Sequence, residues 1–186
     1  GEDAAGVLDG LGAGRERLVG AGDLAGALRQ GIDGVWLAVA IGVVVTVLGV
    51  LATDSLVALF GRQPGTDAAG GTVADDAVTY LRTALLGTTP LLVMLASTGI
   101  LRGLQDTRTP LVVAVAGNLA NIVLNVGLVY GAGLGIAGSA IGSVLAQIAS
   151  AVALTWVVVR VARAEGARLA PRLPGVLAAG RAGVPL

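Results

Sequence analysis

The chain has 186 residues, of which 55% are apolar and only 13% are charged. Soluble domains carry roughly 25% charged residues, and the charges here gather between long neutral runs, which excludes an ordinary soluble domain. The formal net charge is zero, so no overall field draws the chain to nucleic acid. Histidine and cysteine are absent, which removes imidazole bases, disulfides and zinc–thiolate sites from the available chemistry.

Residues 1–33 are polar and rich in glycine, with a short helical pattern near residues 22–30 that Asp23 could cap. The chain starts on Gly1 rather than Met, and its last residues, "AGVPL", resemble the start of another apolar segment. We therefore expect the sequence to be part of a longer protein.

Four apolar segments are long enough to cross a membrane, since a bilayer core of about 30 Å requires about 20 residues of helix. They are residues 34–53, 83–101, 109–130 and 136–159. The last two come from one uncharged run, which the glycines of "GAGLG" at 131–135 divide by a turn. The sequence therefore predicts an all-α membrane protein with four transmembrane helices in residues 34–159.

The arginines predict the orientation, because cytoplasmic loops carry an excess of basic residues. Most lie in residues 1–33, in the loop after the second span and in residues 160–186, whereas only Arg62 and Arg82 follow the first span. We expect both termini to be cytoplasmic in a plasma (inner) membrane, with 160–186 as a basic linker and the start of a next helix. The external side also carries four carboxylates, which we interpret as solvated charges on a glycine-rich loop rather than as a cation site: Asp54, Asp67, Asp75 and Asp76.

Two polar stripes run along the third and fourth spans. At about 100° per residue, Asn118, Asn121 and Asn125 fall within about 60° of one another. The fourth span has its own stripe, made of Ser139, Ser143, Gln147 and Ser150. An unpaired amide in hydrocarbon is costly, so the stripes either join the helices by hydrogen bonds or line a polar cavity. Amide and hydroxyl oxygens are hard ligands that suit Na⁺ or water.

Other motifs leave alternatives open. Pro90 lies in the middle of the second span and removes one backbone hydrogen bond, which makes either a static bend or a hinge, with the hydroxyls of Thr88 and Thr89 near the freed groups. The glycine pairs 138/142 and 99/103 favour close helix packing, within the chain or in a homodimer. "GLGIAG" at 133–138 fits a dinucleotide fingerprint, but no carboxylate follows about 20 residues later.

The order of three motifs resembles the multidrug and toxin extrusion (MATE) family, and most of all its DNA-damage-inducible bacterial branch. The motifs are "GAGD" at 20–23, "GILRGLQDTRTPL" at 99–111 and "GNLANIVLNVGLVYGAGLGIAGSAIGSVLAQ" at 117–147. The resemblance covers about residues 18–186. It implies a fold of twelve helices in two lobes, of which the four spans are helices three to six of the amino-terminal lobe. It also implies export of organic, often cationic, compounds in exchange for H⁺ or Na⁺ by alternating access.

The resemblance further implies a cation site. The Asn of the family's fifth helix matches Asn121, the acidic position four residues on matches Asn125, and the hydroxyl of the sixth helix matches Ser143. At Asn125 an amide replaces the carboxylate, and the acidic residue of the first helix lies outside this chain. Asn118, Ser139 and Gln147 are predicted to shape the cavity. The implied partners are a small organic substrate, membrane lipid and the missing helices of the parent transporter, with no cofactor beyond the coupling ion.

Two other functions remain open at this point. One is a flippase for lipid-linked precursors from the same wider superfamily, whose cavities tend to be lined by arginine to hold pyrophosphate. The spans here carry no central arginine, which favours small organic substrates. The other is a truncated remnant that does not transport. An enzyme is not expected, because no candidate catalytic base lies within the spans.

Overall fold

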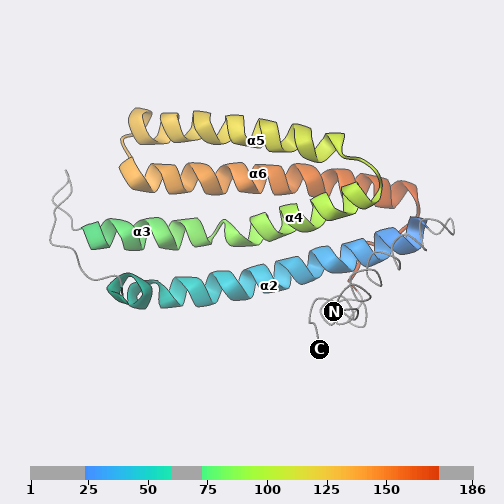
Figure 1. Ribbon diagram of the computed structural model, residues 1–186, viewed down its shortest axis with the longest axis horizontal. Coiled ribbons are helices and arrows are strands. Elements are labelled where there is room, and N and C mark those ends of the chain that lie inside the picture. Colours follow the sequence, from blue (N-terminus) through green and yellow to red (C-terminus); the bar gives the residue numbers. More distant parts are fainter. Residues whose placement is uncertain (1–23, 60–72, 172–186) are drawn as a thin grey trace, which may run out of the picture.

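The computed structural model describes residues 24–59 and 73–171, which are almost entirely helical (Figure 1). The helices are α2 (Leu24–Leu59), α3 (Val73–Leu85), α4 (Thr88–Gly103), α5 (Arg108–Val126), the short π-helix η1 (Gly127–Gly131) and α6 (Gly135–Ala164). Four helical stretches are long and apolar enough to cross a membrane: Leu24–Leu59, Asp75–Gly103, Arg108–Gly131 and Gly135–Ala164. The predicted all-α architecture with four membrane-crossing helices is confirmed.

The first helix is longer than the apolar segment that predicted it. Helix α2 has 36 residues, so the helical pattern near residues 22–30 and the span 34–53 form one helix. Gly31 lies within this helix where α4 packs against it: a Cβ at Gly31 would lie 2.8 Å from a side-chain carbon of Ile100. At 1.5 Å per residue, α2 is about 54 Å long and exceeds a bilayer core. Asp23, the predicted cap, lies outside the described residues.

The helices form a single layer in the order α5, α6, α3–α4 and α2 (Figure 1). Helix α6 therefore has a neighbour on each side, with α5 on one and the α3–α4 segment on the other. This arrangement leaves two broad faces of the layer. The polar stripes and an apolar groove lie on different sides of α6.

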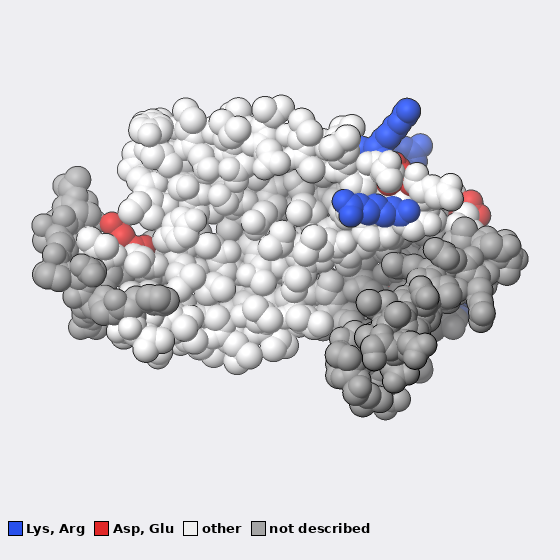
Figure 2. Space-filling view, in the orientation of Figure 1, with Lys and Arg blue, Asp and Glu red and all other residues white. Residues whose placement is uncertain are grey.

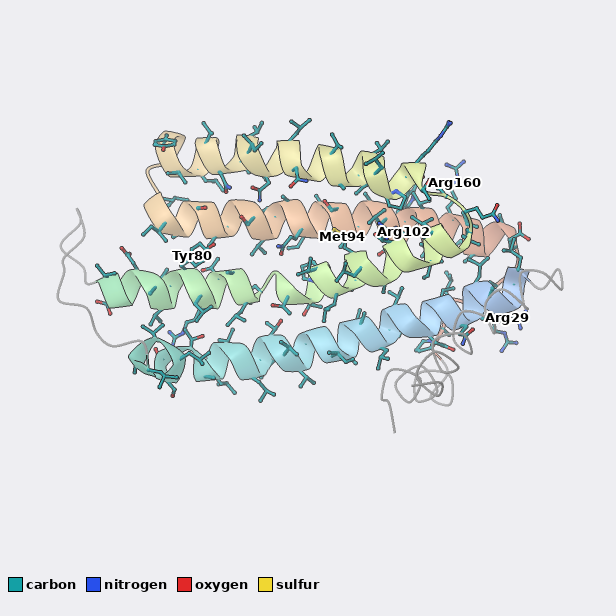
Figure 3. All side chains as sticks on the ribbon, in the orientation of Figure 1. Arg29, Tyr80, Met94, Arg102 and Arg160 are labelled. Atoms are coloured by element: carbon teal, nitrogen blue, oxygen red, sulfur yellow. The ribbon has the colours of Figure 1, made fainter. Side chains whose placement is uncertain are left out.

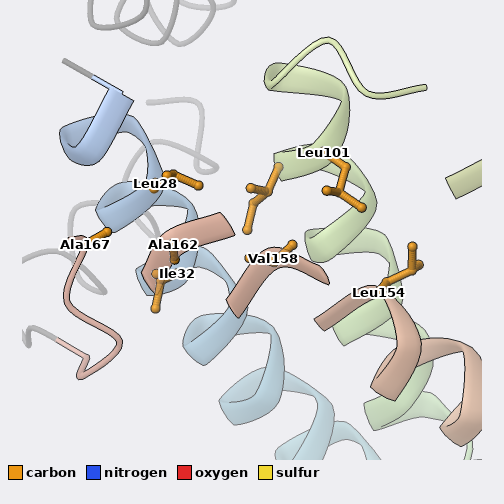
Figure 4. Packing of buried hydrophobic residues seen from close by; sticks show 8 residues of the cluster. Leu28, Ile32, Leu101, Leu154, Val158, Ala162 and Ala167 are labelled. Atoms are coloured by element: carbon orange, nitrogen blue, oxygen red, sulfur yellow. The ribbon is translucent and has the colours of Figure 1, made fainter. Parts of the chain in front are cut away.

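A small hydrophobic core holds the layer together at one end. Leu28 of α2, Leu101 of α4 and Val158 of α6 meet there with at most 1% of their surface exposed (Figure 4). The chain after α6 returns over the same end, where Ala167 is buried. The indole nitrogen of Trp36 donates a hydrogen bond of 3.2 Å to the carbonyl of Leu169.

The second membrane-crossing stretch is interrupted between α3 and α4. The interruption lies at residues 86–87, and Pro90 sits in the first turn of α4, where it has no N–H for the carbonyl of Leu86. The hydroxyl of Thr46 on α2 donates to the carbonyl of Leu85 at 3.1 Å and lies 3.2 Å from the hydroxyl of Thr89. The hydroxyl that bonds a backbone carbonyl at the break therefore comes from a neighbouring helix. The sequence had predicted that the hydroxyls of Thr88 and Thr89 would do this.

The loop between α4 and α5, at the centre of the "LRGLQDTRTP" motif, ends one helix and starts the next. Gln105 has a positive φ of 62°, and Asp106 N–H donates to the carbonyl of Leu101, which closes α4. A carboxylate oxygen of Asp106 then accepts the N–H groups of Arg108 (3.1 Å) and Thr109 (3.0 Å). Hydrogen bonding by the Thr109 side chain, and then by its backbone, lowers the pKa of Asp106 below its ordinary value.

The carboxylates of the predicted external loop lie on helices where they are described. Asp54 of α2 forms an exposed ion pair with Arg82 of α3 at 2.6 Å. Asp75 and Asp76 occupy the first turn of α3, where negative charge complements the helix dipole, so placing them in a flexible loop was wrong. Asp67 and Arg62 lie outside the described residues. Within the described part of the chain, no group of three or more acidic side chains could hold a metal ion.

Replacing Thr46 by valine is expected to destabilise the protein by about 1–2 kcal/mol, because the carbonyl of Leu85 loses its donor. Thr83→Val is the matched control, since the Thr83 hydroxyl is exposed and bonds within its own helix, to the carbonyl of Thr79. Unfolding of the full-length protein in mixed micelles measures both free energies. Equal losses in the two variants would contradict the role of Thr46.

Asp106→Ala is expected to lower the thermal unfolding midpoint at pH 7. Because the folded-state pKa of Asp106 is lowered, the charged carboxylate stabilises the fold above its ordinary pKa, and the effect is lost as the pH falls below about 4. Melting curves of both proteins between pH 7 and pH 3 should therefore converge. A difference that stays constant over this range would show that the charge of Asp106 does not matter.

Candidate polar site between α5 and α6

A tight turn brings α5 and α6 together as antiparallel neighbours. Gly133 and Gly135 adopt positive φ angles of 68° and 52°, and the N–H of Leu134 donates to the carbonyl of Leu128 at 3.1 Å. The predicted glycine turn at 131–135 is present. The remainder of "GLGIAG" starts α6, so this motif serves a helix-to-helix turn and not a strand-to-helix phosphate loop.

Glycines on α6 allow α5 to approach closely. A Cβ at Gly138 would lie 2.9 Å from the carbonyl carbon of Leu128, and one at Gly142 would collide with the amide of Asn125. This pair therefore packs within the chain, as one of the two sequence interpretations has it. Gly99 and Gly103 face open space, since a Cβ added at either position would have no contact within 4 Å.

The two polar stripes face each other and share a chain of hydrogen bonds. The side-chain amide of Asn125 donates to the amide oxygen of Asn121 at 3.0 Å. Asn121 in turn donates to the hydroxyl oxygen of Ser143 at 3.1 Å. The structure thus brings together the three residues that the resemblance assigns to a cation site. The side-chain oxygen of Asn125 is buried and accepts no hydrogen bond from the residues that the structure describes.

A cavity of about 230 Å³ opens beside this chain, between α4, α5 and α6. Its polar lining consists of Asn118, Asn121, Ser143, Gln147 and Ser150. The side-chain oxygen of Gln147 is buried without a partner and lies next to Gly87, at the break between α3 and α4.

Two of the predicted positions do not line this cavity. Ser139 is half-buried one turn before Ser143, and Asn125 reaches the cavity only through its hydrogen bond to Asn121. Sequence reasoning missed Met94 and Gly117, which do line it. Gly117 has no side chain, which leaves room for the hydroxyl of Ser150 beside it. Its position one residue before Asn118 could have indicated that it lines the cavity.

The described lining contains no ionisable side chain. Its amide and hydroxyl groups provide both donors and acceptors, and two of the buried oxygens nearby, of Asn125 and Gln147, are free to accept. Neutral oxygens of this kind coordinate a hard monovalent cation or hold water. No charged side chain within this lining would balance the charge of a cation.

The fold matches solved membrane transporters. A multidrug resistance MATE family transporter in an inward-facing conformation aligns with 97% of this chain at a TM-score of 0.72 and 24% identity, and the chain covers 40% of that structure. A transporter of the MOP superfamily from Pyrococcus furiosus aligns with 92% of the chain at a TM-score of 0.70 and 27% identity, and 36% of it is covered. The four-helix layer is therefore part of a multi-helix membrane transporter fold.

The sequence comparisons identify the family. The MatE family model matches residues 13–127, and the chain belongs to this family. The probable multidrug resistance protein NorM of Thermotoga maritima is 30% identical over 144 residues, which are 75% of this chain and 30% of that protein. The DNA damage-inducible protein F of Escherichia coli is 36% identical over 106 residues, 54% of this chain and 23% of that protein. The chain thus spans less than a third of the length of these relatives.

Gly142→Ala is expected to displace the side chain of Asn125 and to cost about 1–3 kcal/mol of stability, because the added carbon meets both the backbone and the amide of Asn125. Gly99→Ala is the matched control within a helix: it meets no atom and should be neutral or stabilising by up to about 1 kcal/mol. The free energy of unfolding in mixed micelles distinguishes them. If both substitutions behave alike, the contact between Gly142 and Asn125 does not hold the site.

Proposed function

We propose that this chain forms the cation-binding part of the amino-terminal lobe of a multidrug efflux antiporter. The parent transporter exchanges H⁺ or Na⁺ for organic, often cationic, compounds by alternating access. The observation that carries the proposal is the chain of hydrogen bonds from Asn125 through Asn121 to Ser143, beside a polar cavity in otherwise apolar helices. Membership of the MatE family and the name of the Thermotoga relative support it.

In the proposed mechanism, a bound cation replaces the hydrogen bond between Asn125 and Asn121. In the described state, the amide oxygen of Asn121 accepts one hydrogen bond from Asn125. A cation that enters the cavity replaces this hydrogen bond and takes the oxygens of Asn121, Asn125 and Ser143 as ligands. A cation that binds one conformation more tightly shifts the equilibrium between the inward and outward states toward it.

Because the side chain of Asn125 is neutral, the charge of a bound cation would have to be balanced by another helix of the parent transporter. A cation held only by amides and hydroxyls keeps its full charge in a medium of low dielectric constant, which is costly. We infer that an acidic residue on another helix of the parent transporter lies against this cavity and balances the charge. Such a helix would cover the polar face of the layer.

The helix break between α3 and α4 is the proposed hinge of this part of the transporter. Pro90 removes one backbone hydrogen bond, and Thr46 holds the carbonyl of Leu85 from outside the helix. The buried oxygen of Gln147 faces Gly87 at the break and also lines the cavity, so a change in the cavity reaches the hinge through this one side chain.

The distribution of charge supports the proposed orientation and substrate class. Charged side chains gather at the two ends of the layer, and the middle is uncharged (Figure 2). Most of the described arginines lie at the end where α4 and α6 finish, which the positive-inside rule assigns to the cytoplasm of a plasma (inner) membrane. No described arginine lies beside the cavity, which favours small organic substrates over pyrophosphate-bearing lipids.

Asn121→Ala and Ser143→Ala in the full-length transporter are expected to reduce ion-driven drug efflux by about tenfold or more, because each removes one ligand from the ion. The matched control is Ser55→Ala, since Ser55 is exposed on α2 away from the cavity. Efflux from proteoliposomes under a Na⁺ or H⁺ gradient measures the effect, with the amount of folded protein checked by size-exclusion chromatography. Unchanged efflux in both cavity variants would overturn the site assignment.

A further inference from the structure

The face of the layer away from the polar cavity carries a larger groove. It has a volume of about 520 Å³, lies between α4 and α6, and is lined mainly by apolar side chains, among them Pro90, Val93, Ile148, Val152 and Trp156. At about 100° per residue, Val152 and Trp156 lie on the opposite side of α6 from Ser143 and Gln147. Polar groups in membrane helices face the protein interior, so the groove faces the lipid.

The polar atoms in the wall of the groove are already engaged. The hydroxyl of Thr89 lies 3.2 Å from that of Thr46, and the hydroxyl of Thr155 lies 3.2 Å from that of Ser97. These bonds turn the hydroxyls toward neighbouring helices, so hydrocarbon forms the remaining surface. A groove of this kind fits an alkyl chain and offers nothing to a polar solute.

The groove ends in basic side chains. Arg163, in the last turn of α6, is part of its lining and is exposed. Arg160 lies one turn earlier with its guanidinium 5.7 Å from the centre of the Trp156 ring, and Figure 3 shows it at the same end of the layer as Arg102. Arg163 forms no ion pair with any residue in 24–59 or 73–171. Its charge is therefore available to an outside anion.

We propose that this groove binds one anionic membrane phospholipid, with an acyl chain along Val93, Val152 and Trp156 and the phosphate at Arg163. The charge at the groove's end selects this occupant: a transmembrane helix would fill the apolar part but leave the arginine without a partner. Basic pockets between helices at a membrane surface bind anionic headgroups in this way. The proposal concerns the lipid-facing side of the layer and does not depend on the cation site.

The headgroup is tested in the full-length protein in nanodiscs made with phosphatidylglycerol or with phosphatidylcholine. Phosphatidylglycerol should bind more tightly, and Arg163→Gln should weaken its binding by about fivefold, the effect of one arginine near a membrane surface. Arg108→Gln is the matched control, because Arg108 is exposed at the same end but lies on α5, away from the groove. If both variants lose the same affinity, the attraction is that of a basic surface and the proposal fails.

The acyl chain is tested by filling the groove. Val152 is 62% exposed, so Val152→Trp adds bulk without disturbing the core, and Val112→Trp is a control of 64% exposure on α5. Native mass spectrometry of the detergent-purified protein should find one phosphatidylglycerol retained by the Val112 variant and none by the Val152 variant. Retention by both overturns the assignment. If no lipid is retained by the unaltered protein and Val152→Trp breaks its fold or a dimer, another helix or a second copy occupies the groove instead.

Discussion

The cost of leaving a hydrogen-bonding group unpaired in an apolar helix is the constraint on which this structure depends. Polar side chains deep in the four spans pair with neighbouring helices: Asn121 with Ser143, Thr46 with the carbonyl of Leu85, and Ser97 with Thr155. Apolar packing alone gives membrane helices little reason to choose one register over another, since lipid is as apolar as leucine. These pairs provide that choice. Glycines at 42 and 142 then let the paired helices approach to the required distance.

The same constraint divides the layer into two faces. Asn118, Asn121, Ser143 and Gln147 gather on one side of α5 and α6, where a cavity remains beside them. The hydroxyls on the other side point inward to neighbouring helices, which leaves an apolar surface with arginines only at its end. The layer therefore has one polar face and one apolar face. The polar groups of α5 and α6 thus share one face, and the apolar groove lies on the other.

Features that depend on composition and spacing were predicted from the sequence. The four spans follow from uncharged runs, and the turn at 131–135 follows from glycines in a segment too long for one helix. The facing stripes follow from helical periodicity. Asn121, Asn125 and Ser143 share a chain of hydrogen bonds, and their assignment to a cation site stays a prediction. Features that depend on tertiary contacts were not predicted. The contact of Ile100 with Gly31 and the hydrogen bond from Thr46 to the carbonyl of Leu85, beside the break, join residues far apart in the sequence.

The unpaired oxygen of Asn125 shows what the sequence could not decide. An amide has two donors and one acceptor group, and here one donor is used while the buried oxygen lacks a partner. A carboxylate at this position would carry a charge, whereas the amide supplies a fixed donor to Asn121 and cannot release a proton at physiological pH. The buried oxygens of Asn125 and Gln147 are therefore the acceptors that this arrangement leaves for a donor group or a cation.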